Sequence, residues 1–115
     1  MWRVRLTRRA LRDIEEIHGY STERWGLDVA TGYVAGIERA LSDLETDPSL
    51  LRREADWSTH LRFLAVRKHV LVCDVIGTTI FVLAVPHGSM DIVAKLEGLE
   101  PRLRDESRSR HDETD

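Results

Sequence analysis

Two short segments hold the side chains best suited to bind charged groups or to transfer protons. Arg67, Lys68 and His69 are consecutive, and His87 is followed four residues later by Asp91. Cations of this kind pair with phosphates or carboxylates, and histidine also serves as a general acid or base near neutral pH. Each segment has a plainer interpretation too: the first as a solvated turn, the second as a linker in which Asp91 caps a following helix. Both alternatives remain open.

Other familiar sites are not indicated by the sequence. The motifs GxGxxG, GxxxxGK[ST], HExxH, CxxC and GxSxG do not occur. The five histidines lack the spacing of metal ligands, so we expect neither a metal nor another cofactor. Cys73 lies in an apolar run, which favours a small buried side chain over a nucleophile. Asp13, Glu15 and Glu16 share a helix face with two arginines, which indicates a solvated, charge-paired surface.

The composition fits one domain of ordinary size. Of 115 residues, 42% are hydrophobic and 32% are charged, a profile that neither disordered nor membrane proteins share. The net charge of −3 disfavours a general nucleic-acid binder, because such domains are usually basic. A single cysteine excludes an internal disulfide and suits a reducing compartment. No apolar run approaches the roughly 18 residues of a membrane span, and the first residues do not resemble a signal peptide, so we expect a cytoplasmic protein.

Apolar residues at three- to four-residue spacing predict two helices in the first half of the chain. Their boundaries follow from capping residues, which are Thr7 and Gly26 for the first helix and Asp28 for the second. The apolar stripe of the first helix reaches Trp25, and that of the second, over 29–44, begins at Val29. Gly32 and Gly36 each cost about 1 kcal/mol relative to alanine, which suggests a close approach of the helix backbones. We therefore expect an antiparallel helical hairpin.

Strand patterns flank this hairpin. Alternation over 2–7 predicts an edge strand, and three β-rich runs predict a meander over 61–66, 70–76 and 79–85. The last run is apolar on both faces and needs a second neighbour, which the N-terminal strand supplies. The predicted fold is α+β with two layers and the order β-α-α-β-β-β, its hairpin packed on a mainly antiparallel four-stranded sheet.

The remaining segments carry weaker patterns. Residues 45–60 suggest a loop or a short broken helix, and 92–99 suggest a short helix. Residues 101–115 hold many charges and little apolar surface, so we expect a charged disordered tail after a domain that spans 1–100.

The order of elements, together with three motifs, resembles the RelE/ParE toxins of bacterial type II toxin–antitoxin modules, and the ParE branch most. The motifs are Tyr20 with Glu23, Arg24, Trp25 and Gly26; Val66 with Lys68, His69 and Val70; and His87 and Gly88 with Met90 and Asp91. The resemblance covers residues 2–99 and rests on the combination of the motifs, since none is specific alone.

This resemblance implies a toxin that inhibits growth by binding DNA gyrase. It also implies a cognate antitoxin, whose C-terminal segment wraps the fold, and therefore a toxin–antitoxin hetero-oligomer in the cytoplasm. No membrane association and no direct sequence-specific nucleic-acid binding are expected. The candidates for contact with the target are Arg67, Lys68, His69, His87 and Asp91, none of them assigned a catalytic role.

Two alternatives stay open. A RelE-like, ribosome-dependent mRNA endonuclease would work without metal and would draw its acid, base and cations from Arg67, Lys68, His69 and His87. Members of the family often carry a polar or basic residue where this chain has Ala84, and arginine where it has Ser89. These departures, with the acidic net charge, favour a protein inhibitor over an enzyme. A degenerate member that binds antitoxin without toxic activity is the second alternative.

Overall fold

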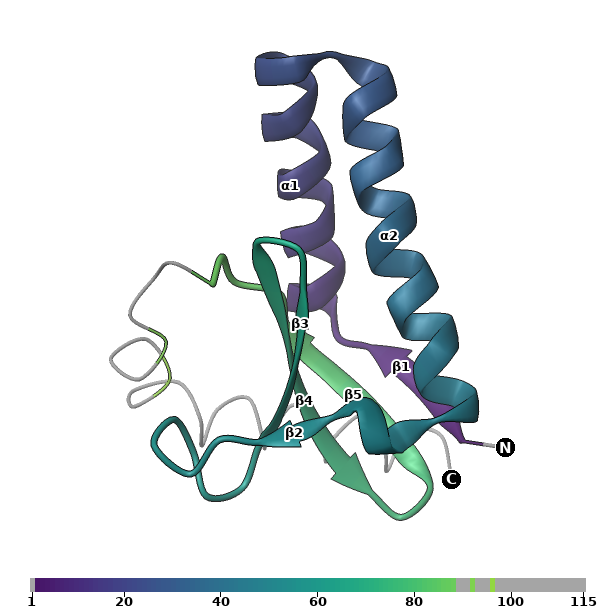
Figure 1. Cartoon of the computed structure of the whole chain (residues 1–115), viewed down its shortest axis with the longest axis vertical. Helices are drawn as coiled ribbons and strands as arrows, with labels where there is room; N and C mark the ends of the chain where they lie inside the picture. Colours follow the sequence, from purple (N-terminus) through teal and green to yellow (C-terminus); the bar gives the residue numbers. More distant parts are fainter. Residues whose placement is uncertain (1, 89–91, 93–95, 97–115) are drawn as a thin grey trace.

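A helical hairpin lies on one face of a five-stranded sheet in the computed structural model of the chain, which describes residues 2–88, 92 and 96 (Figure 1). In chain order the elements are β1 (Arg3–Leu6), α1 (Arg8–Trp25), α2 (Leu27–Thr46), the 3-10 turn η1 (Pro48–Leu50), β2 (Arg52–Arg53), β3 (Arg62–Val66), β4 (His69–Ile76) and β5 (Thr79–Ala84). The sheet order is β1-β5-β4-β3-β2, with β1 parallel to β5 and the other pairs antiparallel. The α+β class, the two layers and the position of the N-terminal strand beside the last strand are confirmed.

The predicted number of strands is wrong by one. Residues 52 and 53, expected in a loop or broken helix, form β2 and pair with Phe63 and Arg62 of β3. Both arginines of β2 are exposed, so they carry none of the apolar alternation by which a strand is recognised from sequence. This strand exists because its backbone extends the free edge of β3.

Capping groups set the ends of the hairpin. The Thr7 hydroxyl accepts the N–H of Ala10 at 3.2 Å, which confirms Thr7 as the N-cap of α1. Gly26, with φ at 93°, ends α1 and also begins α2, because glycine adopts this backbone conformation without strain. Helix α2 therefore starts at Leu27 rather than at 29. Asp28 lies in its first turn and is not the expected cap.

Both faces of the sheet are covered by apolar side chains. On the hairpin side, Ile17 and Ile37 pack against Leu71 and Val82. On the opposite side, the core is formed by Leu61, Phe63, Val70, Val72, Phe81, Leu83, Ala84, Ile92 and Leu96. These two cores explain why β4 and β5 are apolar on both faces. The rest of the predicted helix over 92–99, and the whole predicted tail over 101–115, lie outside the described residues.

The hairpin extends beyond the sheet at its turn (Figure 1). There the side chains of Trp25 and Val29 are 55% and 53% exposed, and those of Tyr20 and Leu27 are exposed to a similar degree. The expectation that Trp25 and Val29 belong to buried stripes is wrong, because the sheet does not reach this far along the helices. The fold thus presents large apolar side chains at one end of the molecule.

A candidate binding cleft between α1 and the sheet

Two of the segments singled out from the sequence meet at one end of the sheet. The N–H of Val70 donates to the carbonyl of Pro86 at 2.9 Å, and the N–H of Gly88 donates to the carbonyl of Lys68 at 2.7 Å. These bonds fasten the turn between β3 and β4 to the segment that follows β5. As a result His69 lies directly opposite His87.

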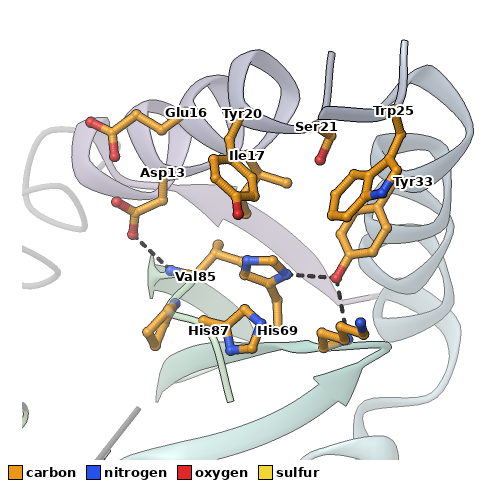
Figure 2. A pocket seen from close by; sticks show the side chains of 12 residues that line it. Asp13, Glu16, Ile17, Tyr20, Ser21, Trp25, Tyr33, His69, Val85 and His87 are labelled. Carbon is orange, nitrogen blue, oxygen red and sulfur yellow. Dashed lines mark hydrogen bonds between the residues drawn. The ribbon is translucent and has the colours of Figure 1, made fainter. Parts of the chain in front are cut away.

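A cleft of about 270 Å³ opens between these two segments and α1 (Figure 2). It is lined by Asp13, Glu16, Ile17, Tyr20, Ser21, Trp25, Tyr33, Lys68, His69, Val85, Pro86 and His87. The residues that line it therefore come from α1, from α2, from the turn between β3 and β4 with the start of β4, and from the segment just after β5.

His69 is held by its neighbours in the floor of the cleft. The Tyr33 hydroxyl lies 2.6 Å from Nδ1 of His69 and accepts the backbone N–H of Lys68 at 3.2 Å. The rings of His69 and His87 meet edge to face, with their centroids 5.0 Å apart. Burial lowers the pKa of His69 and the nearby His87 lowers it further, whereas Asp13 acts in the opposite direction. His69 is therefore neutral near pH 7, a state in which Nδ1 can accept the Tyr33 hydroxyl proton.

Arg67 packs against α2 and does not line the cleft. Its backbone has a φ of 54°, and its guanidinium carbon lies 5.4 Å from the centre of the Tyr33 ring. A Cβ added at Gly36 would lie 3.4 Å from Nε of Arg67, whereas one added at Gly32 would meet nothing within 4 Å. The expected close approach between helix backbones is thus wrong. Gly36 makes room for Arg67 from the turn between β3 and β4.

Asp13 joins α1 to the end of the sheet. Its Oδ2 accepts the backbone N–H of Val85 at 2.9 Å, just after β5 (Figure 2). The expectation of a purely solvated acidic face is therefore wrong for this residue. Glu16, one turn further along α1, is exposed and also lines the cleft.

Aromatic rings form the outer wall. The Tyr20 and Trp25 rings pack edge to face with centroids 6.1 Å apart, and both are more than half exposed. The guanidinium carbon of Arg24 lies 5.6 Å from the Tyr20 ring centre and 5.7 Å from that of Trp25. Such distances are typical of cation–π contacts.

Sequence reasoning found only part of this site. The structure brings Lys68, His69 and His87 together in the cleft, and the same three residues line a neighbouring hollow with Arg67. Asp91 lies outside the described residues. The sequence analysis did not place five other lining residues in the site, namely Asp13, Glu16, Tyr20, Trp25 and Tyr33. The motif that contains Tyr20 and Trp25 was noted, but sequence alone did not connect it with the histidines.

Neither the cysteine nor a metal cluster adds a second site within the described residues. Cys73 is fully buried, and burial raises the pKa of its thiol, so it is a core side chain as expected. Among the residues that the structure describes, no group of three histidine, cysteine or acidic side chains is arranged to hold a metal ion. No helix in the described part of the chain is long and apolar enough to cross a membrane.

The family is decided by a profile match. The profile described as "ParE toxin of type II toxin-antitoxin system, parDE" matches residues 4–92, a range that contains every residue lining the cleft. The chain belongs to the ParE toxin family. This confirms the resemblance seen in the sequence and its ParE branch.

Two relatives agree with this assignment to the ParE family. Toxin ParE1 of Caulobacter vibrioides is 29% identical over 92 residues, which are 80% of this chain and 95% of that protein. A solved structure titled "Chromosomal ParDE TA system from P. aeruginosa" has a TM-score of 0.67 and 19% identity, and the match covers 76% of this chain and 96% of that one. At this identity the second likeness shows the ParE fold alone.

Proposed function

We propose that the protein is a growth-inhibiting ParE toxin that binds DNA gyrase in the bacterial cytoplasm and is neutralised by a cognate antitoxin. The observation that carries this proposal is the profile match over 4–92, which spans the helical hairpin and all five strands except the first residue of β1. Inhibition by binding needs a shaped surface and no catalytic group, which agrees with the absence of recognisable catalytic motifs.

The positions of the cations favour an inhibitor over a ribosome-dependent endonuclease. The histidine pair with Lys68 offers an acid, a base and one cation, which is the observation that keeps the endonuclease as a second candidate. Stabilising a phosphate in the transition state takes further preorganised cations. Arg67 lines a neighbouring hollow with Lys68, His69 and His87, but its guanidinium lies over the Tyr33 ring. Ala84 is buried in the core on the opposite face of the sheet and supplies no cation.

The exposed end of the hairpin supports an antitoxin partner. Tyr20, Trp25, Leu27 and Val29 are each more than half exposed. Large apolar side chains gathered in this way mark surfaces that other proteins cover. We therefore expect the toxin to be isolated as a hetero-oligomer with its antitoxin.

Two assays on one preparation test the target. We expect the purified protein to inhibit supercoiling by gyrase, or to trap cleaved DNA, and to leave mRNA on ribosomes intact. Site-specific mRNA cleavage that is lost in Lys68→Ala and His87→Ala, but kept in the control Arg39→Ala on the exposed face of α2, would establish the endonuclease instead. Antitoxin binding with no effect in either assay would show a degenerate member.

The partner is tested separately by co-expression with the product of the neighbouring small open reading frame. We expect the two proteins to purify together and to dissociate in the submicromolar range by calorimetry. No binding at micromolar concentrations would contradict the toxin–antitoxin proposal.

A further inference from the structure

The cleft beside α1 has the size of one long side chain. Its volume of about 270 Å³ lies just below the range of roughly 300–1,000 Å³ that is usual for small-molecule sites. The inner walls are apolar and buried, and are formed by Ile17 of α1 and by Val85 and Pro86 of the segment after β5. A partner's side chain that enters here would be flanked by the exposed rings of Tyr20 and Trp25.

One end of the cleft is anionic. Asp13 and Glu16 lie one turn apart on α1, and both carboxylates are drawn at the end opposite Tyr33 (Figure 2). Oδ2 of Asp13 accepts the N–H of Val85, which leaves Oδ1 for another donor. The backbone N–H of Lys68 donates to the Tyr33 hydroxyl, so the backbone of this residue lies at the other end of the cleft. The cleft therefore has its negative charge at the α1 end.

Guanidinium groups of this chain lie over the aromatic rings around the cleft. Arg24 lies over Tyr20 and Trp25, and Arg67 lies over Tyr33. The electron-rich faces of such rings favour cations, and arginine more often than lysine. His69, whose pKa burial lowers, adds no positive charge to the floor near neutral pH.

We propose that this cleft receives one arginine side chain of a partner protein, with the guanidinium against Asp13 and Glu16 and the aliphatic stem along Ile17 and Val85. Arginine fits better than lysine because its planar head can pair with carboxylates and stack on a ring at the same time. An acidic side chain would be repelled by the two carboxylates. The net charge of −3 also favours the approach of a basic segment.

This inference rests on the proposed function only for the identity of the partner, which would be the antitoxin. The cleft itself can be tested without it. The full chain, labelled with ¹⁵N, is titrated with N-acetyl-arginine amide at constant ionic strength, and the amide of Val85 and the indole N–H of Trp25 are followed by NMR. We expect saturable shifts at both, with millimolar affinity.

The controls separate charge from shape. N-acetyl-citrulline amide has nearly the same shape without the charge, and we expect it to bind at least threefold more weakly. Asp13→Asn, which keeps an oxygen for the Val85 N–H, and Glu16→Gln should each weaken arginine amide at least threefold. Glu15→Gln, an exposed neighbour that does not line the cleft, should leave the affinity unchanged. Equal binding of citrulline amide, shifts produced by N-acetyl-tryptophan amide alone, or no arginine-dependent shift would overturn the proposal.

A second measurement distinguishes failure of the site from failure of the proposed function. We expect the double variant Asp13→Asn, Glu16→Gln to bind the co-expressed antitoxin at least tenfold more weakly than wild type and Glu15→Gln. Antitoxin affinity within twofold of wild type would refute the arginine site and leave the toxin–antitoxin function intact. Arginine amide binding without any antitoxin binding would support the site and refute the function.

Discussion

Replacing Tyr33 by phenylalanine removes one oxygen and leaves the ring in place. That oxygen lies 2.6 Å from Nδ1 of His69 and accepts the N–H of Lys68 at 3.2 Å. The ring, with Arg67 over its face, is retained in the variant. The change therefore tests whether the hydroxyl ties α2 to the turn between β3 and β4.

The expected loss of stability is about 1 kcal/mol. Each hydrogen bond contributes roughly 1 kcal/mol net, but Lys68 is exposed and its N–H can turn to water. His69 is half-buried, so Nδ1 loses its donor with less compensation. For a domain of this size, 1 kcal/mol corresponds to a fall in Tm of about 3–6 °C.

Urea denaturation of Tyr33→Phe and the control Tyr20→Phe measures this difference. Tyr20 is 57% exposed, so the loss of its hydroxyl should change the free energy of unfolding by less than about 0.5 kcal/mol. The ¹⁵N shifts of the His69 ring provide a second readout, and we expect the proton on Nε2 in wild type. Equal stability of the two variants would refute the hydrogen bond, and a proton on Nδ1 would refute its direction, because the Tyr33 oxygen would then be the acceptor.

Three further predictions concern the same part of the molecule. Burial, and then His87, lower the pKa of His69 from 6.5 on folding, so protonation of His69 favours the unfolded chain. Denaturation measured from pH 7.5 to 5 should therefore show that wild type loses more stability below pH 6.5 than His69→Gln does. Parallel stability curves for the two proteins would contradict this prediction. Asp13→Ala should lower the free energy of unfolding by about 1.5–3 kcal/mol, because a buried backbone N–H loses a charged acceptor, and a Tm equal to that of Asp13→Asn would argue against the bond. Gly32→Ala should raise the free energy of unfolding by about 0.5–1 kcal/mol, and Gly36→Ala should raise it less because the new Cβ contacts Arg67. Calorimetry that finds Gly36→Ala the more stable variant would contradict this packing.

The order of the elements could be predicted because their patterns are local. Thr7 and Gly26 mark helix ends whatever surrounds them, and the alternation in 2–7 and the apolar runs of the meander are visible residue by residue. The need of the last strand for a second neighbour also predicted the N-terminal strand as its partner, although not the parallel direction of the pair. By contrast, β2 consists of two exposed arginines and depends entirely on the edge of β3.

The site was harder to predict because its residues are distant in sequence. Asp13 looked like one of several helix carboxylates, and only the register of α1 against β5 makes it the acceptor for Val85. Tyr33 falls within the apolar stripe predicted over 29–44, and only the turn between β3 and β4 places His69 beside it. Side chains such as Trp25 keep the spacing of a buried stripe, yet the length of the sheet decides whether anything covers them.

The pairing of the first strand with the last has a consequence for synthesis on the ribosome. Arg3 of β1 pairs with Thr79 of β5, and the buried Thr7, which caps α1, donates its N–H to Val82 and its hydroxyl to Leu83. A nascent chain that has not yet emerged past these residues holds a strand and a hairpin with no sheet to cover them. Such non-local contacts form late and slowly. Translation products that end before β5 therefore lack the folded domain, and the cleft is assembled only after β5 and the segment that follows it have been made.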